Sequence, residues 1–212
     1  MTGCGCSGNV KFDGLSAGYK RALWVVIAIN GIMFLVEMVA GTLAGSQALK
    51  ADALDFLGDT ATYAISLFVI GMPLIWRARA ALFKGLSLGA MGLWVLGSTI
   101  YHVLILGVPQ AEVMGAIGFL ALAANLTSVL ILVKYKDGDA NVRSVWLCSR
   151  NDAIGNLAVV LAASGVWVME SAWPDLIVAG IMANLFLLSS TQIVRQALAE
   201  LSNEKLVSGV AQ

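Results

Sequence analysis

Long apolar segments alternate with short polar connections along the chain. Each apolar segment is about as long as the roughly 20 residues that a helix needs to cross the hydrocarbon core of a bilayer. The pattern predicts six transmembrane helices, at about residues 21–44, 48–73, 80–106, 111–134, 144–168 and 173–198. Because the connections are short, neighbouring helices should pack antiparallel in one bundle.

The amino-acid composition supports the same fold class, an all-α membrane protein. Of the 212 residues, 59% are hydrophobic and only 12% are charged, and the mean hydropathy is +0.85. A soluble domain carries about twice that fraction of charged residues. The first 20 residues are polar and lack the apolar run of a signal peptide. We therefore expect an N-terminal tail over residues 1–20, a six-helix domain over 21–200 and a short tail over 201–212.

The basic residues predict how the helices are oriented. Of the 13 Lys and Arg residues, all but Lys50 and Arg150 lie next to helix ends that would share one side of the membrane with the N-terminus. Cytoplasmic segments are enriched in Lys and Arg, so both termini should be cytoplasmic. Arg150 lies inside the fifth helix, where it can reach the interface or pair with a carboxylate such as Glu37, and the sequence does not decide between these.

Several polar residues lie inside the predicted membrane segments. A charged side chain at the centre of a membrane helix costs at least about 2.5–3.5 kcal/mol on insertion scales. Such residues are retained where they face a cavity, a partner or an ion. The set comprises Glu37, Asp52, Asp55, Asp59, Asp152, Asn30, Asn125, Asn151, Asn156 and Asn184.

The spacing of four of these residues is typical of a metal site. Asp55 and Asp59 are one helical turn apart on the second helix, and Asp152 and Asn156 repeat that spacing on the fifth. Two such helices brought face to face would supply four oxygen ligands, the number that a tetrahedral divalent site needs. We therefore take Asp55, Asp59, Asp152 and Asn156 as candidate metal ligands.

Other polar residues are candidates for an accessory role. Asn30 and Glu37 share one face of the first helix, and Asp52 lies close to the stripe of carboxylates on the second. Asp52 is near the start of its helix, where a carboxylate commonly caps the helix end. Asp55 and Asp59 repel each other and burial penalises both charges, so a cation or proton that comes and goes would stabilise them.

These motifs resemble those of the cation diffusion facilitator family. The resemblance lies in GSQALKADALDFLGDTATYAISL over residues 45–67, in SRNDAIGNLAVVLAASG over 149–165, and in the pair Asn30 and Glu37. It implies six transmembrane helices that export divalent metals from the cytoplasm against protons. It also implies that the second helix contributes Asp55 and Asp59 to the ion site and that the fifth contributes Asp152 and Asn156.

The chain departs from the family pattern outside these motifs. Typical members carry a soluble C-terminal domain, and many have a histidine-rich loop between helices four and five, where this chain has KYKDGDANVR. The sequence therefore resembles a short member whose expected homodimer would be held by transmembrane surfaces. Gly85, Gly89 and Gly92 on the third helix have the small-residue spacing of a close helix contact and are a candidate dimer face.

Ligand chemistry alone does not decide which metal the site would bind. Three carboxylates and an amide oxygen suit a hard cation such as Mn²⁺, whereas affinity at a given site rises toward Zn²⁺ and four ligands suit tetrahedral Zn²⁺. Cys4 and Cys6 form an N-terminal CxC that either collects a soft cation or is an incidental tail. We expect Zn²⁺, with Cd²⁺ or Co²⁺, in exchange for protons, and keep Mn²⁺ or Fe²⁺ as the alternative.

The remaining expectations concern partners and other protein classes. Metal ions, protons and the lipid bilayer are the expected partners, without a cofactor or nucleic acid, in the bacterial inner membrane. Intramembrane aspartates also hold metals in phospholipid head-group transferases, but the stretch from Asp52 to Asp59 has neither the DG nor the AR of that longer signature. The other alternative, a non-transporting scaffold protein, would not explain why carboxylates are present inside the membrane segments.

Overall fold

The structure, a computed structural model, describes residues 16–68, 74–104, 107–136 and 140–210. In these ranges the chain forms six long helices and one turn of 3-10 helix, and no strand. The elements are α1 (Ala17–Ala44), α2 (Gln47–Phe68), α3 (Leu74–Leu104), α4 (Ala111–Leu132), η1 (Val133–Tyr135), α5 (Ala140–Met169) and α6 (Trp173–Val210). The all-α fold class predicted from the sequence is confirmed.

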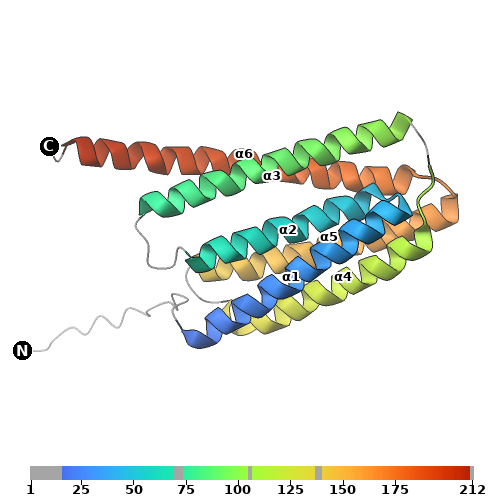
Figure 1. The fold of residues 1–212 in the computed structure, drawn as a ribbon, viewed down its shortest axis with the longest axis horizontal. Helices are drawn as coiled ribbons and strands as arrows, with labels where there is room; N and C mark the ends of the chain where they lie inside the picture. The colour runs from blue at the N-terminus through green and yellow to red at the C-terminus, as the bar shows by residue number, and fades with distance from the viewer. Residues whose placement is uncertain (1–15, 69–73, 105–106, 137–139, 211–212) are drawn as a thin grey trace, which may run out of the picture.

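Successive helices run in opposite directions, as their short connections predict (Figure 1). Helix α1 begins and α6 ends at the same end of the bundle, which we call the terminus end; the other is the opposite end. Helices α3 and α6 pack against each other and form a pair beside a second group made of α1, α2, α4 and α5. Helix α2 joins the two groups, because it contacts α1 and α5 on one side and α3 and α6 on the other.

The helix boundaries agree with the predicted spans within a few residues at most ends. The largest difference is at α6, which continues to Val210, so that residues 201–210 extend the last helix. Helix α1 begins earlier than expected, at Ala17, because the Ser16 hydroxyl accepts a hydrogen bond from the Tyr19 amide and caps its first turn.

Five of the described helices are long and apolar enough to cross a membrane. Helix α2 is the exception, because Lys50, Asp52, Asp55 and Asp59 interrupt its apolar run. Large apolar side chains on the other helices point outward, and Leu43, Leu130 and Trp167 are each more than 70% exposed. An outer surface of this kind suits lipid, and the protein is an integral membrane protein whose most polar helix is covered by its neighbours.

The turn between α1 and α2 consists of only two residues. Gly45 adopts a left-handed backbone conformation with φ of 71°, which glycine takes without steric cost. The Ser46 amide then donates a hydrogen bond to the Gly41 carbonyl at 3.0 Å and closes the last turn of α1. The Ser46 hydroxyl accepts from the Leu49 amide at 3.0 Å, so one residue ends α1 and caps α2.

The glycine-rich face of α3 lies against α6 of the same chain. A Cβ atom at Gly85 would lie 2.9 Å from Val194 Cγ2, and one at Gly89 would lie 2.6 Å from Ser190 Oγ. The Ser190 hydroxyl donates a hydrogen bond to the Gly85 carbonyl at 2.6 Å, across the same contact. The predicted close contact is thus present within the chain, which corrects the expectation that this face joins two copies.

Replacing Gly89 by alanine should lower thermal stability, because the new methyl group would collide with Ser190 in a contact that has no room for it. We expect a loss of about 1–3 kcal/mol, measured as a lower Tm of the purified protein in detergent. Gly97→Ala on the same helix is the matched control. No atom lies within 4 Å of a Cβ placed there, so a gain in helix propensity should leave Tm unchanged or raised. Equal effects at the two positions would contradict this account of the α3–α6 contact.

Candidate metal site

A cavity of about 410 Å³ lies between α2, α3, α5 and α6. Helix α2 contributes Asp55 and Asp59 to its lining, and α5 contributes Asp152. Neutral polar groups also line the cavity, and the rest of the wall is mainly apolar. The predicted facing of the second and fifth helices therefore brings three carboxylates together in one cavity between the helices.

The three carboxylates lie close to one another. The Asp152 side chain is within hydrogen-bonding reach of both Asp55 and Asp59. Tyr63, one turn beyond Asp59 and fully buried, donates a hydrogen bond from its hydroxyl to the Asp59 carboxylate. The same hydroxyl lies 3.2 Å from the Ser149 hydroxyl on α5. Tyr63 thus fixes the orientation of Asp59, a role that the sequence pattern did not reveal.

The carboxylates do not form a closed metal-binding group in this arrangement. Within the described residues, no three His, Cys, Asp or Glu side chains are placed to hold one metal ion together. Cys4 and Cys6, the candidate N-terminal thiols, lie outside the described residues.

Asn156, the fourth ligand expected from the sequence, lies in a separate buried network. Its side-chain amide donates a hydrogen bond to Asp52 at 2.5 Å, and its carbonyl oxygen accepts one from Asn125 at 2.7 Å. Asn156 is fully buried and is not among the residues that line the cavity. The structure places Asp52 and Asn156 one layer beyond the three cavity carboxylates, toward the opposite end of the bundle.

Glu37 is buried beside this network. Its side chain is 0% exposed, it lies next to Asp52, and neither of its oxygens receives a hydrogen bond from the described residues. Two neighbouring buried carboxylates require a compensating positive charge, of which a shared proton is the smallest. Asn30, also fully buried, donates to the Val26 carbonyl of its own helix at 2.8 Å.

Arg150 does not provide that positive charge. It is exposed, and its guanidinium donates a hydrogen bond to the Asn151 side chain at 3.2 Å. The sequence left open whether Arg150 reaches the membrane interface or pairs with a carboxylate such as Glu37. The structure does not pair it with Glu37.

A third polar group, missed in the sequence, holds the start of α2 at the opposite end. Asp175, in the first turn of α6, accepts hydrogen bonds from the Ser46 hydroxyl at 2.6 Å and from the amides of Gln47 and Ala48 at 2.8 and 3.0 Å. These are amides that the first turn of a helix leaves without a partner. The Gln47 side chain in turn accepts from the Ser98 hydroxyl at 2.6 Å. A carboxylate distant in sequence therefore ties α6 to α2.

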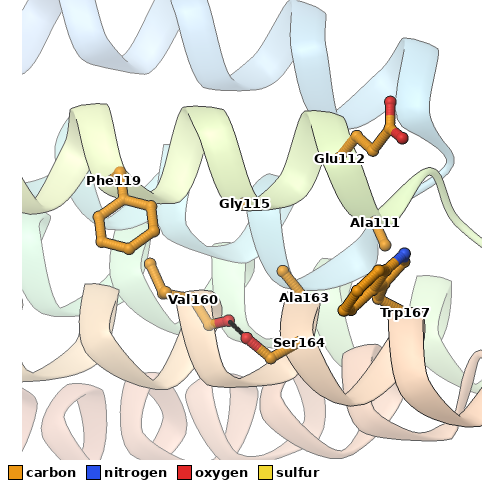
Figure 2. Close-up of a pocket in the computed structure, with 8 residues that line it drawn as sticks. All are labelled: Ala111, Glu112, Gly115, Phe119, Val160, Ala163, Ser164 and Trp167. Atoms are coloured by element: carbon orange, nitrogen blue, oxygen red, sulfur yellow. Dashed lines mark hydrogen bonds between the residues drawn. The ribbon is translucent and has the colours of Figure 1, made fainter.

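A smaller cavity of about 300 Å³ lies between α4 and α5 (Figure 2). Its wall is mainly apolar, and Figure 2 shows the Glu112 carboxylate turned away from α5. The Ser164 hydroxyl donates to the Val160 carbonyl of its own helix at 3.1 Å. This groove offers no inward-facing charged group, so the larger cavity is the candidate ion site.

An all-helical membrane bundle with acidic side chains from two helices in one internal cavity is the architecture of an ion-handling membrane protein. The sequence matches the model of the cation efflux transmembrane domain over residues 23–72 and 77–202. This match covers most of the chain, and the protein belongs to the cation efflux family.

Curated relatives agree with this assignment at modest identity. The chain is 27% identical to the metal cation efflux system protein CzcD of Cupriavidus metallidurans, over 84% of this chain and 60% of the relative. It is 27% identical to the zinc transporter ZitB of Yersinia pestis, over 86% and 62%. It is 25% identical to the human proton-coupled zinc antiporter SLC30A8, over 68% and 46%. The chain thus spans about 60% of the length of the first two relatives. These relatives are transporters, not enzymes.

The variant Asn156→Asp tests which role Asn156 has. It would remove the amide that donates to Asp52 and add a carboxylate to a fully buried pair of acids. An uncompensated buried charge costs about 3–5 kcal/mol, so we expect a Tm roughly 6 to 20 °C lower, at about 2–4 °C per kcal/mol. Gln110→Glu, at the exposed residue before α4 whose side chain makes no capping hydrogen bond, is the control and should change Tm little.

Metal affinity, measured on the same Asn156→Asp protein, separates the two roles. If Asn156 ligates the cation, as predicted from the sequence, the added charge should tighten binding without a large loss of stability. A loss of stability with unchanged affinity would assign Asn156 to the Asp52 network.

Proposed function

We propose that this protein exports Zn²⁺ from the cytoplasm in exchange for protons, with Asp55, Asp59 and Asp152 as the ligands of the transported ion. The observation that carries the proposal is that carboxylates from α2 and α5 line one cavity inside the bundle. Asn156 stays a predicted ligand, and its hydrogen bonds to Asp52 and Asn125 describe its present contacts.

Proton exchange is supported by the chemistry of carboxylates that are clustered inside a membrane protein. A cluster of three such groups inside a membrane needs positive charge nearby, supplied by protons or by a metal ion. On the cytoplasmic side the carboxyl groups would release protons as the metal binds, and on the other side protons would return as the metal leaves. Because the carboxylates are not yet grouped to hold an ion, binding would draw them closer together.

The proposed direction of transport rests on the distribution of basic residues. The starts of α1 and α3 and the end of α4 lie at the terminus end of the bundle, and the start of α2 lies at the opposite end. By sequence position, the terminus end therefore has Lys20, Arg21, Arg79, Lys134 and Lys136, and the opposite end has Lys50. An excess of Lys and Arg marks the cytoplasmic side. We place the terminus end in the cytoplasm and, given the bacterial relatives CzcD and ZitB, the protein in a bacterial inner membrane.

The choice of Zn²⁺ draws support from the affinity order of divalent metals and from relatives named as zinc transporters. One observation favours a second candidate, Mn²⁺. The acidic groups of the cavity offer only oxygen atoms, and its described lining contains no imidazole or thiolate.

Asp59→Ala should reduce metal uptake into proteoliposomes to the level of empty liposomes, because it removes a charged oxygen ligand. Uptake is measured with a fluorescent indicator for Zn²⁺ and, in parallel, for Mn²⁺. Glu112→Ala, at an exposed carboxylate in the first turn of α4, should transport normally. Wild-type-like flux in Asp59→Ala would refute the site. Wild-type uptake of Mn²⁺ without Zn²⁺ would correct the metal and leave the site standing.

Metal uptake should also depend on the proton gradient. In vesicles that accumulate metal, each ion that enters should displace protons outward, so the lumen should become more alkaline in step with flux. A protonophore should abolish accumulation above the external concentration. The lumenal pH is followed with a trapped dye, and Asp59→Ala vesicles serve as the control for leakage. Uptake that is indifferent to the gradient would indicate a channel or a uniporter.

A further inference from the structure

A lysine lines the same cavity as the three carboxylates. Lys84 is on α3, ten residues from its first residue, Leu74, which corresponds to about 15 Å along the helix. It lies within the apolar stretch Ala78–Val103, long enough to cross a membrane, and its side chain is half-buried. A charged side chain at such a position is costly unless it faces a cavity or an opposite charge.

The location of Lys84 satisfies both conditions. It lines the cavity together with Asp55, Asp59 and Asp152, and it is close enough for its charge to act on the Asp59 carboxylate. It is the one basic residue among the described residues that line this cavity. Arg79, five residues earlier on α3, is exposed instead and lies over the Trp76 ring at 5.2 Å.

We propose that Lys84 is a built-in counter-ion of the acidic cluster, whose ammonium group neutralises part of its charge until a divalent cation displaces it. This inference rests on the proposed function of Asp55, Asp59 and Asp152 as ligands of the transported ion. Helix α3 supplies the cation, whereas α2 and α5 supply the carboxylates. Lys84 therefore acts on the transported ion through the carboxylates and is a specificity-determining residue.

Two effects follow from a tethered positive charge beside a cation site. The charge weakens the binding of any cation and promotes its release, which benefits a transporter because the ion must leave. It also favours divalent cations, because a monovalent cation gains no advantage over an ammonium group that is already held in place. Lys84 would thus keep Na⁺ and K⁺ out of a site that has only oxygen ligands.

The test compares Lys84→Met and Lys84→Gln with Lys84→Arg, using the full chain in proteoliposomes at one fixed pH, with Zn²⁺ as the probe. Removal of the charge should lower KM for Zn²⁺ at least about tenfold and lower kcat, because binding tightens and release slows. Uptake by these two variants should be inhibited by KCl relative to N-methylglucamine chloride at equal ionic strength. Lys84→Arg keeps the charge and should behave like the wild type.

Arg79→Met is the matched control for the loss of one positive charge from α3. It should leave KM and the response to KCl unchanged, because Arg79 does not line the cavity. An unchanged or higher KM in Lys84→Met and Lys84→Gln would overturn the inference, as would the same shift in Arg79→Met. If Asp59→Ala abolishes uptake while both Lys84 variants behave like the wild type, the metal site stands and the counter-ion role falls. If Asp59→Ala transports normally, the proposed function itself fails.

Discussion

The arrangement of the bundle depends on the cost of placing carboxylates in a membrane. Helix α2 carries Asp52, Asp55 and Asp59, and an acidic side chain that faced lipid would destabilise the inserted helix. The structure avoids this cost by surrounding α2 with α1, α3, α5 and α6. The outer helices present large apolar side chains instead. The helix least suited to lipid therefore lies inside the protein and joins its two helix groups.

The polar contacts of α2 form three layers along its axis. Asp59 and Asp55 face the cavity with Asp152, and Asp52 joins Asn156 and Asn125 in the next layer. From Asp52 to Asp59 the helix rises about 10 Å. At the opposite end, Asp175 holds the first amides of the helix. The groups of the second and third layers, Asp52, Asn156, Asn125 and Asp175, are buried and hydrogen-bonded, as polar groups in a protein interior usually are. The three carboxylates that face the cavity are half-buried.

The sequence predicted the helices because the length of an apolar run is a local property. It also predicted that the second and fifth helices would present Asp55, Asp59 and Asp152 toward each other, because the spacing of residues fixes the face of a helix. Contacts that depend on the three-dimensional packing were not predictable. The pattern that suggested Asn156 as a ligand contains no information about Asn125, 31 residues away, to which it is hydrogen-bonded.

The glycines of α3 are a second example of a contact whose partner the sequence could not predict. Their spacing predicted a close helix contact, and the structure has one, but the spacing does not say which helix supplies the other side. Asp175 and Tyr63 were missed for a related reason. An aspartate in the first turn of a helix commonly stabilises that helix, whereas Asp175 satisfies the amides of α2, more than 120 residues earlier in the chain.

The Asp175 contact has a consequence for movement between the two helix groups. One carboxylate accepts three hydrogen bonds from the start of α2, and it belongs to α6, which packs with α3 in the other group. A separation of α6 from α2 at this end would break all three bonds together and leave two amides and a hydroxyl without partners. Such a step is cooperative, because all three bonds end on the same carboxylate and lengthen together as it moves away. At this end of the bundle, α2 and α6 should therefore be either in full contact or fully separated.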